Sequence, residues 1–521
     1  MQIRAARPLA FLVGAILLCG FTTIAQVHDE VDLDVVARIK DEALQRSQVM
    51  DVISYLTDVY GPRLTGSPNL KSAADYAVGK MKEWGVSNPH LESWGPFRKG
   101  WSNERFSAHV TAPQAYPLIG YPKAWTPGTN GTVTGEAVLA AIESDQDLET
   151  WHGRLRGKFV LVTPLRNVRA LFDPLGRRLT DEQLDTLSKP PPPRAPAAAG
   201  TTPPRPAQPR SRDFPRRRLQ FFVDEGVAAV IEAGRGDGGT VFVMAGNLPQ
   251  SPEAPVPPQV VLAVEHYGRI ARTLQKQIPV TLEMNVQNKV YDEDLSSFNV
   301  VGEIPGTDKV NELVMIGAHL DSWHTGTGAT DNAVGSGVML EVMRILKATR
   351  LTMRRTVRIG LWTGEEQGLL GSRAYVAEHF ADRATMQRKT EHDRVSAYYN
   401  LDNGTGAIRG IYLQGNKAVA PIFQEWMAPF VDLGMTTLSV RSVGGTDHTS
   451  FDAVGLPGFQ FVQDPIEYET RTHHSNMDVF ERLQQQDVMQ NAAIIAAFVY
   501  DTANREELLP RKPLPQPASS R

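Results

Sequence analysis

The sequence predicts an α/β fold with a mostly parallel central sheet and helices on both faces. Three apolar runs of strand type lie in the C-terminal half of the chain: LVMIGAHLDS, TVRIGLWTGEE and VSAYYNLDN. Segments with helical apolar spacing, GVMLEVMRILK and AVAPIFQEWMAPFVDLG, lie between and after these runs. Strands that alternate with helices are typical of a parallel sheet covered on both sides.

Each predicted strand ends in side chains that bind metals in other proteins. His319 and Asp321 end the first run, Glu365 and Glu366 end the second, and Asp402 ends the third. Ligands of open α/β sheets bind beyond the carboxyl ends of the strands. We therefore expect these five side chains to share one site.

Two loop segments add further candidate ligands. GATDNAVGSG contains Asp331, and THHSNMD contains His474. Histidines together with carboxylates suit zinc in a site that keeps positions open for water and substrate. A carboxylate shared by two ions is the usual device of a two-metal clamp. The set predicts two Zn²⁺ ions and metal-assisted hydrolysis.

The composition is that of a soluble globular protein. The 521 residues are 41% hydrophobic and 21% charged. This length is too great for one ordinary core, so two domains with tails are expected. The formal net charge of −4 gives no indication of a nucleic-acid partner.

The first 25 residues have the pattern of a signal peptide. Arg4 and Arg7 precede the apolar residues 9–18, and the small residues around Ala25 offer a cleavage site. We expect a secreted or periplasmic protein of bacterial-type export, with a mature charge of −6 after the loss of two arginines from −4. The apolar run is short for a membrane span and no second long run exists, so no span is expected after cleavage.

Cysteine usage agrees with bacterial export. Cys19 is the only cysteine and lies within the predicted signal peptide, so the mature chain has no disulfide. Whether Cys19 carries a lipid stays open.

Changes in composition divide the rest of the chain. Residues 26–116 form the N-terminal part of the domain that carries the site, and residues 286–510 form its main part. Residues 117–285 consist of short β-rich pieces with glycine breaks, which predicts an inserted β-rich domain. Within this insert, residues 189–212 are rich in proline and alanine and are expected to form a disordered loop. Residues 511–521 are expected to form a flexible tail.

The ordered set of segments resembles the two-zinc exopeptidase family of aminopeptidase, glutamate carboxypeptidase and transferrin receptor type. The likeness covers about residues 50–110 and 286–510, and the insert resembles the protease-associated domain of that family. The resemblance implies a zinc exopeptidase fold. It also implies a metal-ligand set of His319, Asp331, Glu366, Asp402 and His474, with Asp331 as the bridge.

The resemblance also implies roles for residues beside the ligands. Glu365 is expected to act as the general base, and the carboxylate of Asp321 is expected to orient His319. His448, in GGTDHTSF, is either a donor to the substrate carbonyl or a local hydrogen-bond partner. His324 and His473 are interpreted as neighbours of the motifs rather than ligands.

Several functions stay open at this point. An enzyme that recognises a free α-amine would be an aminopeptidase, and one that recognises both termini would be a dipeptidase. A carboxypeptidase that acts on long chains is the less favoured choice. Two other classes share the architecture: a receptor-like binding module that has lost its ligands, and a glutaminyl-cyclase-like acyl transferase. The expected partner is a peptide or dipeptide substrate, and a homodimer is left open.

Overall fold

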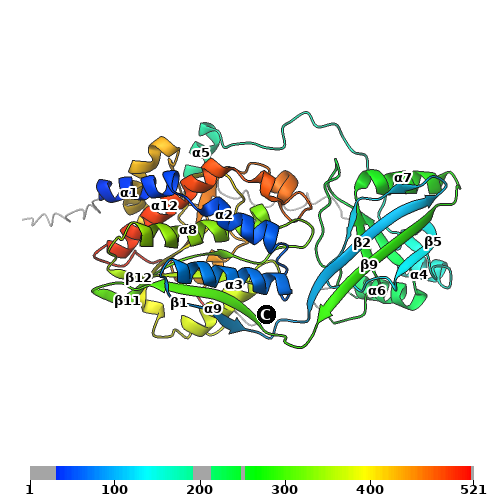
Figure 1. Cartoon of the computed structure of the whole chain (residues 1–521), viewed down its shortest axis with the longest axis horizontal. Coiled ribbons are helices and arrows are strands. Elements are labelled where there is room, and N and C mark those ends of the chain that lie inside the picture. Colours follow the sequence, from blue (N-terminus) through cyan, green and yellow to red (C-terminus); the bar gives the residue numbers. More distant parts are fainter. Residues whose placement is uncertain (1–30, 192–212, 248–252, 518–521) are drawn as a thin grey trace, which may run out of the picture.

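The computed structural model describes residues 31–191, 213–247 and 253–517. The predicted signal peptide at residues 1–25 lies outside the described residues. So do residues 192–212 of the proline-rich segment. The described chain forms a mixed α/β structure with two eight-stranded sheets, and Figure 1 shows them in two lobes side by side.

The first sheet belongs to the lobe that carries the predicted ligands. In spatial order its strands are β1 (Ser87–Trp94), β10 (Ser297–Ile304), β12 (Arg355–Trp362), β11 (Lys309–His319), β13 (Val395–Asn400), β16 (Gly458–Gln463), β14 (Ile408–Tyr412) and β15 (Thr437–Ser439). The four central neighbours β12, β11, β13 and β16 are parallel. The three strands with candidate ligands are therefore parallel neighbours, as predicted, and their carboxyl ends meet at one edge.

Helices cover both faces of this sheet. They are α1 (Leu33–Gln45), α2 (Val49–Ser54), α3 (Pro68–Glu83), α8 (Val334–Ala348), α9 (Leu370–His379), α10 (Ala420–Met427), α11 (His448–Asp452) and α12 (Gln485–Asn504). Along β11, Val314 and Ile316 are buried in the core that includes α8 and α12. Leu313 and Met315 point the other way, into the core that includes α9 and α11. This alternation is why the strand reads as a continuous apolar run.

Helix boundaries follow ordinary capping rules. The Ser67 side chain accepts a hydrogen bond from the Leu70 N–H at the start of α3. Gly85, just beyond the end of α3, has a φ of +74°, which glycine adopts without strain. The predicted helix in residues 418–434 is divided into α10 and a 3₁₀ segment, Ala428–Leu433.

The second sheet forms the other lobe. Its strands, in spatial order, are β3 (Tyr116–Pro117), β2 (Gly100–Ala112), β9 (Thr281–Tyr291), β5 (Thr132–Leu139), β6 (Phe159–Leu161), β7 (Ala229–Ala233), β8 (Gln259–Leu262) and β4 (Gly120–Pro122). It is accompanied by α4 (Asp145–Trp151), α6 (Phe214–Glu225) and α7 (Val264–Gln275). The sheet starts before residue 117 and ends after residue 285, because β2 and β9 pair along most of their length.

One part of this lobe differs from the expectation. The segment PQVVLAVEHYGRIARTL is interpreted from sequence as β-rich, yet only Gln259–Leu262 is a strand, and Val264–Gln275 is a helix. Tyr267, Ile270 and Ala271 are buried there, and this spacing is helical.

An arm from the second lobe lies on the first (Figure 1). It includes α5 (Asp181–Ser188), which packs against β15. Arg177 forms a β-bridge with Ile466, and the guanidinium of Arg178 pairs with the carboxylates of Asp464 and Asp487. The arm therefore fastens the two lobes together beside the loop that leads to His474.

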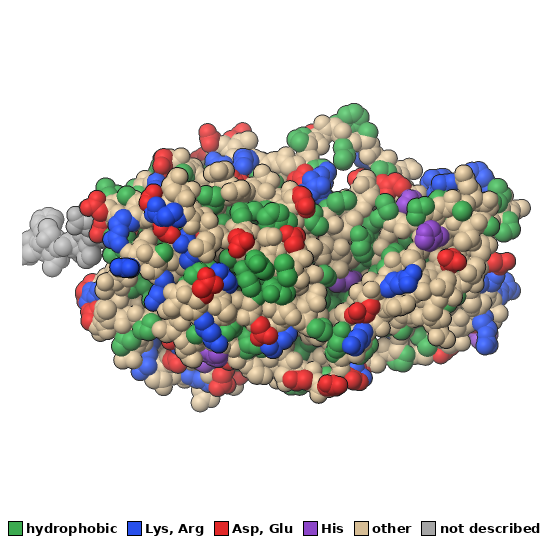
Figure 2. All heavy atoms as spheres, in the orientation of Figure 1, with side chains coloured by type: hydrophobic (Ala, Val, Ile, Leu, Met, Phe, Trp, Pro, Cys, Tyr) green, Lys and Arg blue, Asp and Glu red, His purple; other side chains and the backbone are tan. Residues whose placement is uncertain are grey.

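The molecular surface carries mixed charges. On the face in Figure 2, acidic and basic side chains are interspersed over both lobes. Among the described residues, no helix combines the length and apolar character needed to cross a membrane.

Candidate metal centre and active-site cleft

Three predicted ligands meet at the end of β11. The Nε2 atom of His319 lies 3.2 Å from Oδ1 of Asp331 and 3.4 Å from Oδ1 of Asp402. His319 is the last residue of β11, Asp402 follows β13, and Asp331 lies in the loop before α8. Their ligand atoms lie within 4.8 Å of one another, so one cation can contact all three.

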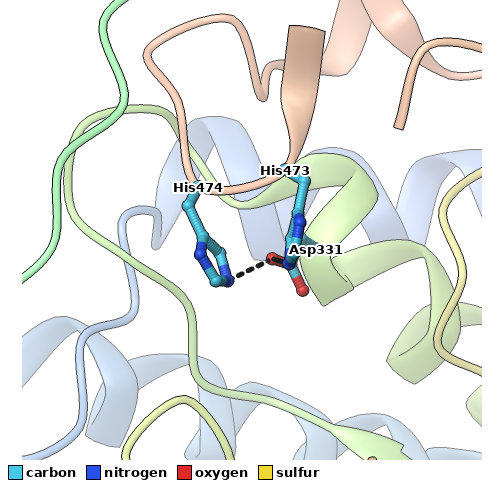
Figure 3. Close-up of side chains that lie close together, drawn as sticks. All are labelled: Asp331, His473 and His474. Carbon is cyan, nitrogen blue, oxygen red and sulfur yellow. Dashed lines mark ion pairs between the residues drawn. The ribbon is translucent and has the colours of Figure 1, made fainter. Parts of the chain in front are cut away.

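A second group shares Asp331. Nε2 of His474 lies 3.3 Å from Oδ2 of Asp331 and 2.9 Å from Oε2 of Glu366. Nε2 of His473 lies 3.7 Å from the same Asp331 oxygen, and Figure 3 shows both imidazoles beside that carboxylate. The two carboxylate oxygens of Asp331 thus face different groups of ligands.

Several of these ligand atoms are buried without a hydrogen-bond partner. Within the described part of the chain this holds for Nε2 of His319, Oδ2 of Asp331, Oε1 of Glu366 and Oδ1 of Asp402. Buried polar atoms in folded proteins are almost always paired, so a converging set of unpaired ones needs a partner. Two histidine nitrogens among carboxylate oxygens are a donor set that fits zinc.

The Asp321 carboxylate contacts the glutamate loop more closely than it contacts His319. Nδ1 of His319 lies 2.9 Å from the backbone carbonyl oxygen of Asp321, whereas the carboxylate of that residue is 3.6 Å away. The carboxylate instead accepts hydrogen bonds from the Thr65 hydroxyl and from the backbone N–H groups of Glu365 and Glu366. The main chain of Asp321 thus orients the imidazole, and its side chain holds the glutamate pair.

His448 does not line the cleft, so of its two expected roles the structure favours the local hydrogen-bond partner over the donor to the substrate. Its side chain is buried, with Nε2 2.9 Å from the carbonyl oxygen of Val443 and 2.8 Å from Nε2 of Gln414. It is the first residue of α11 and is one of the buried residues of that helix. His324 belongs to neither group of converging ligand atoms, and its Nε2 lies 2.7 Å from the Pro122 carbonyl oxygen.

Two residues that support the candidate metal centre could not be predicted from the sequence. The buried guanidinium of Arg63 donates to the backbone carbonyls of Leu56, Leu320, Thr327 and Gly328. Burial lowers its pKa to about 10, so it stays charged at neutral pH. It therefore ties the end of β11 to the loop that carries Asp331.

Asp478 acts on the same loop from the other side. Its carboxylate accepts the backbone N–H groups of Thr330, at 2.6 Å, and of Asp331, at 3.2 Å. Arg63 lies in a Gly/Pro-rich break and Asp478 lies four residues after His474, so neither falls in a periodic segment. Only the folded chain shows that both hold the Asp331 loop.

An open cleft of about 630 Å³ leads to the ligand cluster. Its walls include Glu365, Thr446, Tyr468 and His473. Pockets of this size hold small organic ligands. Its lining is rich in carboxylates and histidines and includes four of the five predicted ligands, Asp331, Glu366, Asp402 and His474, so a substrate in the cleft would contact the centre directly.

The carboxylates in the cleft repel one another. Burial raises the pKa of Glu365 well above its ordinary value, and the carboxylates of Asp402 and Asp447 add to the rise. Burial likewise raises the pKa of Glu366 to about 7, with a further contribution from Asp331. A bound cation would offset this repulsion, because its charge is the largest in such a site.

The fold and this cluster of ligands define the class of protein as a zinc metallopeptidase, an exopeptidase by its relatives. Residues 299–499 match the model of peptidase family M28. Human carboxypeptidase Q is 26% identical over 462 residues, which cover 88% of this chain and 86% of that protein.

Two solved structures share the fold. The peptidase M28 precursor from Shewanella amazonensis superposes with a TM-score of 0.65 at 23% identity, covering 93% of this chain and 98% of the other. The zinc aminopeptidase from Bacillus subtilis has a TM-score of 0.55 at 19% identity, covering 88% and 95%. The chain is thus similar to the M28 peptidases over residues 299–499 and to carboxypeptidase Q over most of its length, as the motifs GAHLDSW, GTD and HHS also indicate.

Proposed function

We propose that the protein is an exported exopeptidase, an aminopeptidase or a dipeptidase, that hydrolyses terminal peptide bonds with two zinc ions and a glutamate base. One observation carries this proposal. Buried, unpaired ligand atoms from Asp331, Glu366 and Asp402, three residues that line an open cleft, converge with the unpaired Nε2 of His319 just behind them. The centre is built for cations and is open to a substrate.

The ligands divide into two groups with Asp331 between them. His319 and Asp402 would hold one zinc ion, Glu366 and His474 the other, and Asp331 would contact both. Zinc, when bound, polarises the scissile carbonyl and lowers the pKa of water.

Glu365 is the candidate base because it lines the cleft and lies next to the ligand Glu366. In this proposal its carboxylate removes a proton from the attacking water and delivers it to the leaving amine as the C–N bond breaks. Its backbone carbonyl accepts the N–H groups of Gly368 and Leu369, and its N–H donates to Asp321. These bonds hold the main chain of Glu365 in one place, beside the other residues that line the cleft.

The second lobe is the candidate for the protease-associated domain, an insert within residues 100–291. It contacts the metal centre, because the backbone N–H of Val243 donates to the carbonyl of His474 at 3.1 Å. Export rests on the pattern of residues 1–25 in the sequence.

The test combines metal content with a substrate screen. Purified protein is expected to hold two zinc ions per chain and to hydrolyse free dipeptides or amino-acid amides. Peptides with N-terminal glutamine serve as the comparison, because a cyclase would convert them without hydrolysis. Cyclisation without peptide hydrolysis would favour an acyl transferase. Failure to bind zinc, with no turnover of any peptide, would favour a binding module.

A further inference from the structure

Arg373 is the one residue with a permanent positive charge among the described residues that line the cleft. The other ionisable residues of the lining are five carboxylates, two histidines and one tyrosine: Asp331, Glu365, Glu366, Asp402, Glu469, His473, His474 and Tyr468. Lysine and the other arginines are absent from this described lining. A single cationic side chain in an otherwise acidic cleft is a candidate binding partner for an anionic group of the ligand.

The guanidinium of Arg373 has no partner in the described chain. It forms no ion pair and no hydrogen bond there, although arginines elsewhere on the surface, such as Arg354 and Arg388, pair with carboxylates. Its side chain is exposed to the cleft. All five donors of the guanidinium are therefore available to a ligand.

The backbone holds Arg373 close to the proposed base. The carbonyl oxygen of Glu365 accepts the N–H of Leu369 at 2.9 Å, and the carbonyl of Leu369 accepts the N–H of Arg373 at 3.0 Å. Arg373 lies in the first turn of α9, and the loop before it carries Glu365 and Glu366. Two successive backbone hydrogen bonds thus fix the main chain between the two residues, and both side chains line the same cleft, so one ligand can contact both.

We propose that Arg373 binds a carboxylate of the substrate and thereby determines specificity; this rests on the exopeptidase function proposed above. Guanidinium binds carboxylate through two parallel hydrogen bonds, which fix orientation as well as distance. In a short peptide the carboxylate is either the free C-terminus or an acidic side chain. If Arg373 binds the free C-terminal carboxylate, the enzyme is a dipeptidase or a peptidase of very short chains.

Three substrates separate these sources. Leucyl-glycine has a free C-terminal carboxylate, and leucyl-glycine amide has none. Leucyl-aspartic acid α-amide (Leu-Asp-NH2) has only its side-chain carboxylate free and supplies the second source. For Arg373→Ala, kcat/KM on the substrate with the recognised carboxylate is expected to fall about 10- to 100-fold, mainly through KM. Hydrolysis of leucyl-glycine amide should change little. Arg373→Lys should restore part of the loss, because a point charge remains without the paired geometry.

Arg156→Ala is the matched control. Arg156 is exposed in the second lobe, far from the lining of the cleft, and has no ion pair in the described chain. Its replacement should leave all three rates unchanged. Equal losses of Arg373→Ala on all three substrates, or no loss on any, would overturn the proposal.

Binding separates this inference from the proposed function. Zinc-loaded Glu365→Gln protein is titrated with leucyl-glycine, with its amide and with the side-chain acid, with and without the additional Arg373→Ala change. A preference for a carboxylate that disappears with Arg373 supports the inference even if wild-type protein hydrolyses no peptide. No preference, in a protein that does hydrolyse peptides, contradicts the inference and leaves the proposed function standing.

Discussion

The backbone N–H of Val243 donates a hydrogen bond of 3.1 Å to the carbonyl oxygen of His474. The two residues lie in different lobes, and His474 has a φ of +62°, a conformation that few residues other than glycine adopt. Asn476 adds to this contact, because its side chain accepts the Val241 N–H and donates to the Gly239 carbonyl. The second lobe thus holds a proposed metal ligand in place.

Asn476→Ala is expected to weaken zinc binding roughly tenfold, because contacts that orient a ligand contribute to metal affinity. The measurement is zinc affinity by competition with a chelating dye. Asn69→Ala, at an exposed asparagine with a single 3.4 Å hydrogen bond, serves as the control. Wild-type affinity in Asn476→Ala would mean that the second lobe does not steady His474.

Arg63→Lys is expected to lower the free energy of unfolding by about 3 kcal/mol. The lysine ammonium cannot reproduce the hydrogen bonds that the planar guanidinium donates to four backbone carbonyls. Chemical denaturation measures this loss. Arg156→Lys, at an exposed arginine, should be neutral. If Arg63→Lys were as stable as wild type, the guanidinium would not be what joins β11 to the Asp331 loop.

Zinc removal should abolish turnover and lower the melting temperature together. The unpaired carboxylates of the cluster repel one another when no cation is bound. A free zinc concentration of 1,000 times the Kd adds about 4 kcal/mol to the free energy of unfolding. Calorimetry before and after dialysis against a chelator tests this, and added zinc should restore both properties. Full activity in zinc-free protein would contradict the metal assignment.

Asp464→Ala should release the arm that crosses between the lobes. This buried carboxylate pairs with Arg178 and Arg409 and accepts the Leu179 N–H. Removing one partner of a buried ion pair costs about 3 kcal/mol or more. Limited proteolysis should then cut near residues 163–190 faster than in wild type. An unchanged cleavage pattern would show that other contacts, such as those of α5, hold the arm.

The sequence predicted the strands and their ends well, because the pattern of a buried parallel strand is local. His319, Glu365 and Asp402 follow apolar runs, and the parallel β12, β11 and β13 bring them together. Tertiary contacts decided the rest. The His448 side chain is buried against Gln414 and Val443, and the Asp321 carboxylate accepts hydrogen bonds from Thr65 and the glutamate loop.

Arg63 and Asp478 could not be found from the sequence for a similar reason. Each acts through hydrogen bonds to backbone groups of distant residues, and no spacing in the chain records such bonds. The same holds for Arg373, whose position in the cleft depends on the turn between Glu365 and Leu369.

The most direct test of the central claim measures kcat and zinc content together in Glu365→Gln and Asp331→Ala. Glu365→Gln keeps the size of the side chain but cannot accept the proton, so kcat should fall 100-fold or more, roughly, while zinc stays bound. Asp331→Ala should lose zinc and activity together. Glu378→Gln, at an exposed carboxylate on α9, should retain both. Near-normal kcat in Glu365→Gln, or loss of zinc as complete as in Asp331→Ala, would contradict the assignment of Glu365 as the base.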